Sequence, residues 1–376
     1  MSIESPRAGQ QPPPQPEPRL KVAEAADHAV GVKAVAIAMR QAVSQMGVTR
    51  TVRTLTRINQ PGGFDCMSCA WPDPDPGQRH SAEFCENGAK AVAEEGTKAR
   101  VEREFFQIHS VDDLATRSEY WLGKQGRLTE PMVKRPGSRY YEPVGWAEAL
   151  ELVADHLNAL VTPDAAAFYT SGRASNEAAF VYQLFARTFG TNNLPDCSNM
   201  CHESSGVALF DSIGIGKGSV SLLDIYAAEL IVIAGQNPGT NHPRMLSALE
   251  TAKRRGARII SVNPLREAGT TNFRNPQNAR GVVGAGTDLA DLHLRVRANG
   301  DHALFLGIAR LLVEWNAVAP AFVAQYTVGF EAWASMSARS IGGRSPMPVG
   351  FQRTRSRLQR ECLRPRVQPF GAGRWD

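Results

Sequence analysis

The middle of the chain carries the pattern that most constrains its fold. Residues 229–234 (ELIVIA) form a nearly continuous apolar run typical of a buried strand, and residues 257–262 (ARIISV) form a second one. Between them lie a loop over 235–241 and a helical pattern over 243–255, which Gly256 ends. A strand, a loop, a helix and a second strand make a βαβ unit, so we expect parallel strands joined by a right-handed crossover.

The same alternation extends to both sides of this unit. Apolar residues at helical spacing predict helices over 147–161, 180–189 and 303–315, and short apolar runs predict strands over 165–169 and 292–296. The fold class that follows for residues 146–336 is α/β with a mainly parallel sheet.

The part before this sheet has a different character. Residues 1–20 are rich in Pro and Gln, so we interpret 1–45 as a disordered extension followed by a helix that ends at Met46. Residues 46–145 form a smaller, loop-rich domain in this interpretation. Its stretch 61–90 is rich in Gly, Pro, Asp and Cys with little periodicity, and we expect it to need something other than an apolar core.

Residues 337–376 form a fourth zone, in which nine Arg stand against two acidic residues. An ordinary basic tail is one interpretation. We favour an aberrant, Arg-rich tail from a frameshifted or truncated gene product, because the α/β alternation stops in mid-fold after Trp333.

The net charge of +5 does not indicate a nucleic-acid partner, because the other 336 residues carry 33 basic and 35 acidic side chains. Residues 1–20 lack the apolar region of a signal peptide, and no apolar run has the roughly 20 residues of a membrane span. We therefore expect a cytoplasmic protein, in which the six Cys are ligands, nucleophiles or packed thiols rather than disulfides.

The strongest chemical motif is Cys66-Met67-Ser68-Cys69, followed by Cys85. Two thiolates at this spacing can bind one metal ion or one iron–sulfur cluster. A C-x2-C-x3-C cluster motif would place a further ligand at position 73, which is Asp73. The site would then have three Cys, with Asp73 or an outside ligand as the fourth. Zinc, or free cysteines with no ligand, are the alternatives.

A second motif, residues 196–202 (DCSNMCH), contains Cys201 beside His202. A thiolate next to an imidazole suits nucleophilic attack or ligation of a soft metal, although such a Cys can also be simply packed. The loop over 235–241 stands where open α/β sheets bind ligands, yet it matches neither the dinucleotide fingerprint nor a phosphate-binding P-loop. Asn263 after the next strand could contact a ribose or simply form a turn.

The motifs occur in the order seen in one enzyme family. The chain from about residue 45 to 335 resembles the molybdopterin oxidoreductases, and most closely the branch similar to the formate dehydrogenase alpha subunit. The stretches that carry the resemblance are 170–177 (TSGRASNE), 185–187, 190–193 (GTNN), 201–202, 236–238, 242–243, 252–257, 263–264 and 300–304. In the N-terminal part, residues 63–66, 71–74 and 84–90 resemble the subgroup called oxidoreductase alpha (molybdopterin) subunit.

The resemblance implies a formate dehydrogenase or DMSO reductase type of fold with a small N-terminal iron–sulfur domain. Cys201 stands where formate dehydrogenases ligate molybdenum, and His202 stands at the place of a proton-handling His. The cofactors implied are molybdenum with a bis-molybdopterin guanine dinucleotide (bis-MGD), and a 4Fe-4S cluster on Cys66, Cys69 and Cys85. The residues expected to line the two dinucleotides are Gly172, Arg173, Asn176, Gln236, Asn237, Asn241, Asn263, Gly300 and Asp301.

The chain departs from the family pattern in three places. The cluster motif lacks one Cys, Lys90 follows Cys85 by more positions than the relay Lys of formate dehydrogenases does, and family members continue into a C-terminal domain that we expect to be missing here.

The predicted function is two-electron oxidation of a small molecule such as formate, with electrons passed to the cluster and to an acceptor that the sequence does not identify. A truncated, non-catalytic fragment or zinc-binding module is the alternative. A Cys–His hydrolase ranks last, because no Gly-rich nucleophile turn surrounds Cys201.

Overall fold

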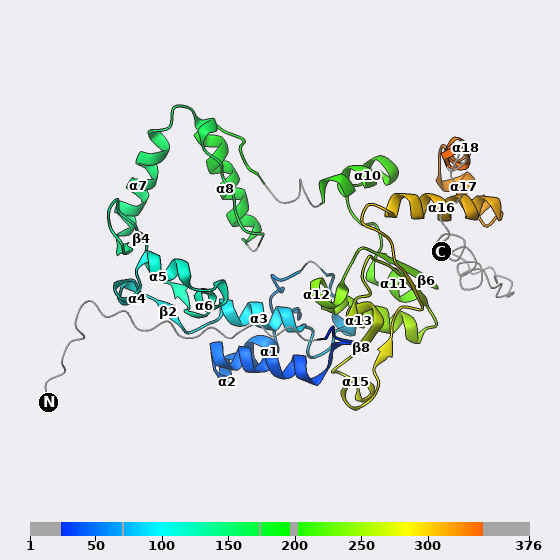
Figure 1. Ribbon diagram of the computed structural model, residues 1–376, viewed down its shortest axis with the longest axis horizontal. Coiled ribbons are helices and arrows are strands. Elements are labelled where there is room, and N and C mark those ends of the chain that lie inside the picture. The colour runs from blue at the N-terminus through cyan, green and yellow to red at the C-terminus, as the bar shows by residue number, and fades with distance from the viewer. Residues whose placement is uncertain (1–23, 70, 173, 196–201, 341–376) are drawn as a thin grey trace. The chain divides into compact units, whose positions relative to one another are not determined.

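The computed structural model describes residues 24–69, 71–172, 174–195 and 202–340 (Figure 1). The described chain divides into two compact units, each built from separate stretches of sequence. The first contains residues up to 229 together with 237–257 and 268–289, and the second contains 230–236, 258–267 and the residues from 290 onward. The boundaries predicted from the sequence, at 45, 145 and 336, remain a prediction.

The first unit is mostly helical. Its helices are α1 (Gly31–Met46), α2 (Val48–Leu55), α3 (Glu86–Glu95), α4 (Arg103–Ile108), α5 (Val111–Thr116), α6 (Glu119–Lys124), α7 (Trp146–Asn158), α8 (Asn176–Phe189), α10 (Glu203–Ile213), α11 (Leu222–Ala227), α12 (Pro238–Asn241), α13 (Pro243–Arg254), α14 (Ala268–Thr271) and α15 (Ala279–Val283). Two 3-10 turns cover Pro76–Gln78 and Pro163–Ala165.

Short strands complete this unit. One mixed sheet has the order β1 (Ala29–Val30), β8 (Asn272–Arg274) and β9 (Thr287–Asp288). Two further pairs join β2 (Arg100–Val101) to β3 (Arg127–Leu128) and β4 (Met132–Val133) to β5 (Glu142–Pro143).

The second unit contains the predicted parallel sheet. Its strands are β6 (Leu230–Ala234), β7 (Arg258–Val262) and β10 (Leu292–Leu294), all parallel in the order β10-β7-β6. They are accompanied by α16 (Asp301–Glu314), α17 (Pro320–Tyr326) and α18 (Phe330–Ser340). The α/β fold class and the parallel pairing are confirmed. Helix α18 extends into the first residues of the predicted tail, and 341–376 lie outside the described residues.

A small core supports the loop-rich stretch of the first unit. Alanines line the facing sides of α1 and α3, and Met46 and Leu55 close this core with exposed fractions of 0% and 4%. Cys66, Met67 and Phe84 of the loop pack against it. The expectation that residues 61–90 need something other than an apolar core was therefore wrong for the base of the loop, because alanine side chains let the two helices approach closely enough to bury it.

One sequence prediction fails between α7 and α8. Ala165 ends a 3-10 turn, and residues 166–169 form no strand. Instead, Phe168 packs its ring against Tyr182, Phe185 and Phe189, and its N–H donates to the Asn193 carbonyl. The two helices form as predicted, yet apolar side chains on them are exposed in the described chain. Helical periodicity identifies a face but not what covers it.

We expect Met46→Ala to lower the free energy of unfolding by about 2–5 kcal/mol, because it leaves a cavity under the cysteine loop. Val48→Ala, at a side chain that is 66% exposed, should change it by less than about 0.5 kcal/mol. Urea titrations of both variants measure this difference, and equal effects would contradict the position of the core.

Candidate functional site

The three predicted ligand cysteines are half-buried and reduced in the structure. Cys85 is the N-cap residue of α3, and its Sγ accepts a hydrogen bond of 3.4 Å from the Gly88 N–H. The Sγ of Cys66 accepts one of 3.4 Å from the Ser68 N–H. Both thiols therefore face backbone N–H groups, which favour a negatively charged sulfur.

A glycine allows two of these sulfurs to converge. A Cβ atom added to Gly88, in the first turn of α3, would lie 2.9 Å from the Sγ of Cys66 and 3.8 Å from the Sγ of Cys85. A real Cβ does not occur at the shorter distance, so any other residue at this position would displace the Cys66 sulfur.

The third cysteine belongs to the same electrostatic environment. Burial raises the pKa of the Cys85 thiol, the charges of Cys66 and Cys69 raise it further, and the hydrogen bond from Gly88 opposes the rise. A bound cation would offset this unfavourable charge at Cys85.

The donor set is compatible with an iron–sulfur cluster. Within the described ranges, no group of three His, Cys, Asp or Glu side chains has the spacing to hold one metal ion. A 4Fe-4S cluster is larger than one ion, so its cysteine ligands stand farther apart. The convergence at Gly88 and the choice of thiols are consistent with such a ligand.

Asn59 ties the two ends of the cysteine loop together, and sequence reasoning missed it. It is 2% exposed and has a positive φ of 55°, which Asn tolerates better than most residues. Its Oδ1 accepts from the Cys66 N–H at 2.8 Å, and its Nδ2 donates to the Glu83 carbonyl at 2.7 Å. The sequence feature that could have indicated this role is an Asn two residues before a Pro-Gly-Gly turn.

Ion pairs hold the loop between Cys69 and Cys85. Nη1 of Arg244, on α13, lies 2.7 Å from Oδ1 of Asp73, and its Nη2 lies 2.8 Å from Oε1 of Glu83. The other oxygen of Asp73 lies 3.6 Å from Nη1 of Arg79. Both oxygens of Asp73 face cations, although its buried Oδ1 makes no hydrogen bond. Whether Asp73 or an outside ligand is the fourth ligand stays a prediction.

The side chain of Lys90 forms an ion pair with Glu86, which lies one turn earlier on α3.

Two predicted pterin residues meet at the carboxyl edge of the parallel sheet. Nδ2 of Asn263, after β7, donates to the carbonyl of Gln236, after β6, at 3.4 Å. Its Oδ1 accepts from the Leu265 N–H at 3.0 Å. Asn263 thus forms a turn, which was one of the two roles that the sequence suggested for it; the other was contact with a ribose. Gly300 and Asp301 begin α16 in the same unit, a place where helix N–H groups suit anions.

The other predicted pterin residues lie in the first unit. Asn237 and Asn241 frame α12, and Asn176 begins α8, whose N-cap Ser175 accepts from the Ala178 N–H. Gly172 lies in the turn before α8. Arg173 lies outside the described residues.

The cluster segment and the α12 segment touch. Nδ2 of Asn87, two residues after Cys85, donates to the carbonyl of Thr240 at 2.6 Å. The stretches that the resemblance assigns to the iron–sulfur cluster and to the pterin are therefore neighbours within one unit.

Cys201 lies outside the described residues, so its pairing with His202 stays a prediction. His202 is exposed and caps α10, with its carbonyl accepting from the Gly206 N–H at 2.8 Å.

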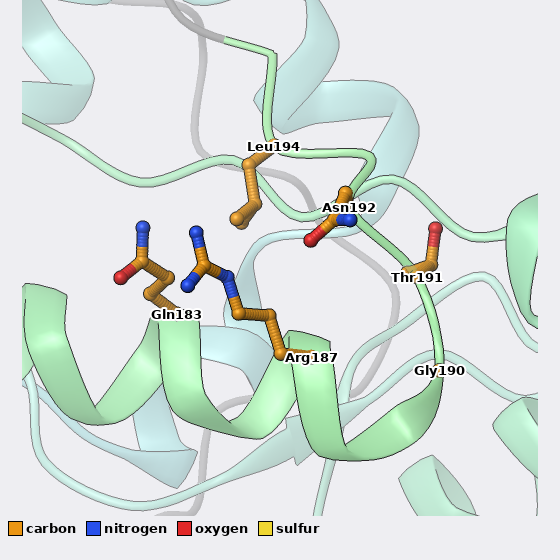
Figure 2. A pocket seen from close by; sticks show the side chains of 6 residues that line it. All are labelled: Gln183, Arg187, Gly190, Thr191, Asn192 and Leu194. Carbon is orange, nitrogen blue, oxygen red and sulfur yellow. The ribbon is translucent and has the colours of Figure 1, made fainter.

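An open hollow of about 740 Å³ lies at the C-terminal end of α8. Figure 2 shows Gln183 and Arg187 reaching from the helix into it, with the side-chain oxygen of Asn192 turned toward Arg187. The adjacent Thr191 donates to Asp164 at 2.7 Å, which fixes this loop against the turn before residue 166. The hollow lies in a stretch that carries the family resemblance, although sequence reasoning gave it no role.

Comparison with known proteins settles the family. The sequence profile of the molybdopterin oxidoreductases matches residues 127–339. The chain belongs to the molybdopterin oxidoreductase family. This confirms the resemblance drawn from the motifs, and it makes the protein a member of an oxidoreductase family whose cofactor is a molybdenum pterin.

Three relatives show the range of similarity. An uncharacterized oxidoreductase of Mycobacterium tuberculosis (strain ATCC 25618 / H37Rv) is 57% identical over 84% of this chain, and protein YdeP of Escherichia coli (strain K12) is 45% identical over 80%. Formate dehydrogenase H of the same E. coli strain is 34% identical over 55% of this chain. The matches cover 41%, 40% and 27% of these relatives, so the chain spans less than half of their length.

We expect Asn59→Ala to lower the free energy of unfolding by about 2–3 kcal/mol, because the buried Cys66 N–H and Glu83 carbonyl lose their partner. Asn158→Ala, at an exposed position of α7, is the matched control and should stay within about 0.5 kcal/mol. Denaturant titration of the metal-free chain measures both, and a loss no larger than the control's would show that Asn59 does not hold the loop.

Proposed function

We propose that this member of the family carries out a two-electron oxidation at molybdenum and passes the electrons to a 4Fe-4S cluster. When bound, the molybdenum of a bis-MGD supplies the two-electron chemistry, and the cluster carries electrons away one at a time. In this proposal Cys66, Cys69 and Cys85 hold the cluster, and Cys201 ligates molybdenum.

The hydrogen bond between Asn87 and Thr240 carries the proposal. It joins the residues just after a cluster ligand to the segment between Asn237 and Asn241, which we assign to the pterin. Electron transfer needs two cofactors close together, and adjacent protein segments provide this closeness.

Helix beginnings and strand ends suit the phosphates of the pterin dinucleotides. We assign to them Gly172, Asn176, Gln236, Asn237, Asn241, Asn263, Gly300 and Asp301, and also Arg173, which lies outside the described residues. The starts of α8 and α16 favour anions through the helix dipole. Asn263 contributes by holding the Gln236 loop in place.

Cys201 and His202 divide the chemistry at the reacting centre. A soft thiolate ligand tunes the metal, and the neighbouring imidazole takes the proton that leaves the substrate. The hydrogen bond from Gly206 to the His202 carbonyl holds the backbone of His202 at the start of α10. His202 is also the residue that directly follows Cys201.

A small substrate such as formate fits the similarity to formate dehydrogenase H, and the electron acceptor is a separate molecule. No helix of the described residues is long and apolar enough to cross a membrane. We place the protein in the cytoplasm, where reducing conditions keep cysteines available as ligands.

Iron and sulfide analysis of the anaerobically purified full chain tests the cluster. We expect iron and acid-labile sulfide in equal amounts and a brown chromophore, both lost in Cys66→Ala, Cys69→Ala and Cys85→Ala. Cys362→Ala is the control and should keep them. Zinc in place of iron, or iron that survives loss of all three thiols, would refute the ligand assignment.

Formate-dependent reduction of an artificial electron-accepting dye tests the reaction. Cys201→Ser should lower its rate by more than the roughly 100-fold that outer-shell changes cause in metal sites. His202→Gln should lower it by about 10²–10⁴-fold, the contribution of a general base, while molybdenum content stays unchanged. Equal rates in Cys201→Ser and the unmodified chain would rule out this Cys as the metal ligand.

A further inference from the structure

The loop between Cys69 and Cys85 is anchored by charge near its start and near its end. The side chains of Asp73 and Glu83 are 19% and 10% exposed, and both face the guanidinium of Arg244, which is 10% exposed. Arg244 also approaches the Trp71 carbonyl, at 3.5 Å. One residue of α13 thus contacts three points of the loop.

Arg79 completes the arrangement from inside the loop. Its Nε donates to the Pro74 carbonyl at 2.7 Å, and its Nη1 donates to the Asn59 carbonyl at 2.8 Å. Two arginines therefore balance the two carboxylates. Burial makes this balance necessary, because an unpaired charge in such a place is unfavourable.

Asp73 occupies the position in the motif at which a fourth cluster ligand is expected. It stands where a fourth cysteine would complete a C-x2-C-x3-C motif, yet its oxygens face Arg244 and Arg79. Serving as an iron ligand would set the iron in competition with these two arginines for the carboxylate. The side chain at this position therefore shapes the loop.

We propose that Arg244 is a positioning residue for the cluster. Through Asp73 and Glu83 it anchors the loop that a fourth ligand would otherwise anchor, so that three thiolates bind the cluster and one iron has no ligand from the protein. This inference rests on the proposed function, because it concerns the same cluster.

An iron without a protein ligand can be released by oxidation. A [4Fe-4S]²⁺ cluster that gives one electron to ferricyanide and one Fe²⁺ to EDTA becomes [3Fe-4S]⁺, and the charges balance. Added Fe²⁺ together with one electron from dithionite reverses the step.

The experiment uses the full chain, purified anaerobically, as the unmodified protein and as Arg244→Gln, Arg244→Lys and Asp73→Asn. Arg254→Gln is the matched control. Arg254 lies on the same helix, and its Nη2 lies 3.2 Å from Oε2 of Glu250, which is not part of the loop. Iron content, the paramagnetic resonance spectrum after one equivalent of ferricyanide, the cluster reduction potential and the half-life of the cluster in EDTA are measured. Circular dichroism reports folding.

We expect the unmodified chain to lose one iron of four, to show a three-iron spectrum and to recover with Fe²⁺ and dithionite. Arg244→Gln should shorten the half-life by about tenfold or more and shift the reduction potential downward, since a nearby cation is lost. Arg244→Lys, which keeps the charge, should restore the potential more fully than the half-life, and Arg254→Gln should match the unmodified chain. The lysine variant also keeps the test valid if Arg244→Gln fails to fold.

The possible results distinguish a failure of the proposed function from a failure of the inference about Arg244. A chain that takes up no iron refutes the cluster, and with it the proposed electron path. A chain that keeps all four irons under oxidation, and loses one in Asp73→Asn, makes Asp73 a ligand and overturns this inference alone. Arg244 variants with the half-life and potential of the unmodified chain also overturn it.

Discussion

The contact between the Arg244 guanidinium and the carboxylates of Asp73 and Glu83 is the interaction on which the cysteine loop depends. The small core of α1 and α3 buries only the base of this loop, so its outer part needs another source of order. Removing one partner from a buried ion pair of this kind costs about 3–5 kcal/mol, because the remaining charge is left uncompensated. The same contact links the loop to α13, the helix that follows the α12 segment assigned to the pterin.

Around this contact, the first unit brings together residues far apart in the sequence. Asn59 joins Cys66 to Glu83, Gly88 lets two sulfurs converge, and Asn87 reaches Thr240. Each link has a plain physical reason: a buried amide must be paired, a close approach needs glycine, and a carbonyl in the last turn of a helix lacks a partner within the helix and accepts an outside donor. Together they hold three thiols next to the loop that we assign to the pterin.

Much of the local structure could be predicted from the sequence. The ELIVIA and ARIISV runs became parallel strands, and Gly256 ends α13 with a positive φ of 96°, as a stop signal should. The strand predicted over residues 165–169 did not form, and Phe168 packs in a cluster of aromatic rings instead. An apolar run does not reveal whether its side chains will pack in such a cluster or its backbone will join a neighbouring strand. The roles of Asn59 and Arg244 depend on contacts with residues far along the chain, and spacing within a motif cannot show these. The motifs did identify the family, since their order along the chain is a long-range property that the sequence records directly.

Mössbauer spectroscopy of the full chain, produced with isotope-enriched iron, tests the central claim most directly. Our account predicts a four-iron cluster in which one iron has parameters distinct from the other three, because three cysteines and no fourth side chain bind it. A spectrum without cluster iron, or one in which all the irons have complete thiolate ligation, would contradict it.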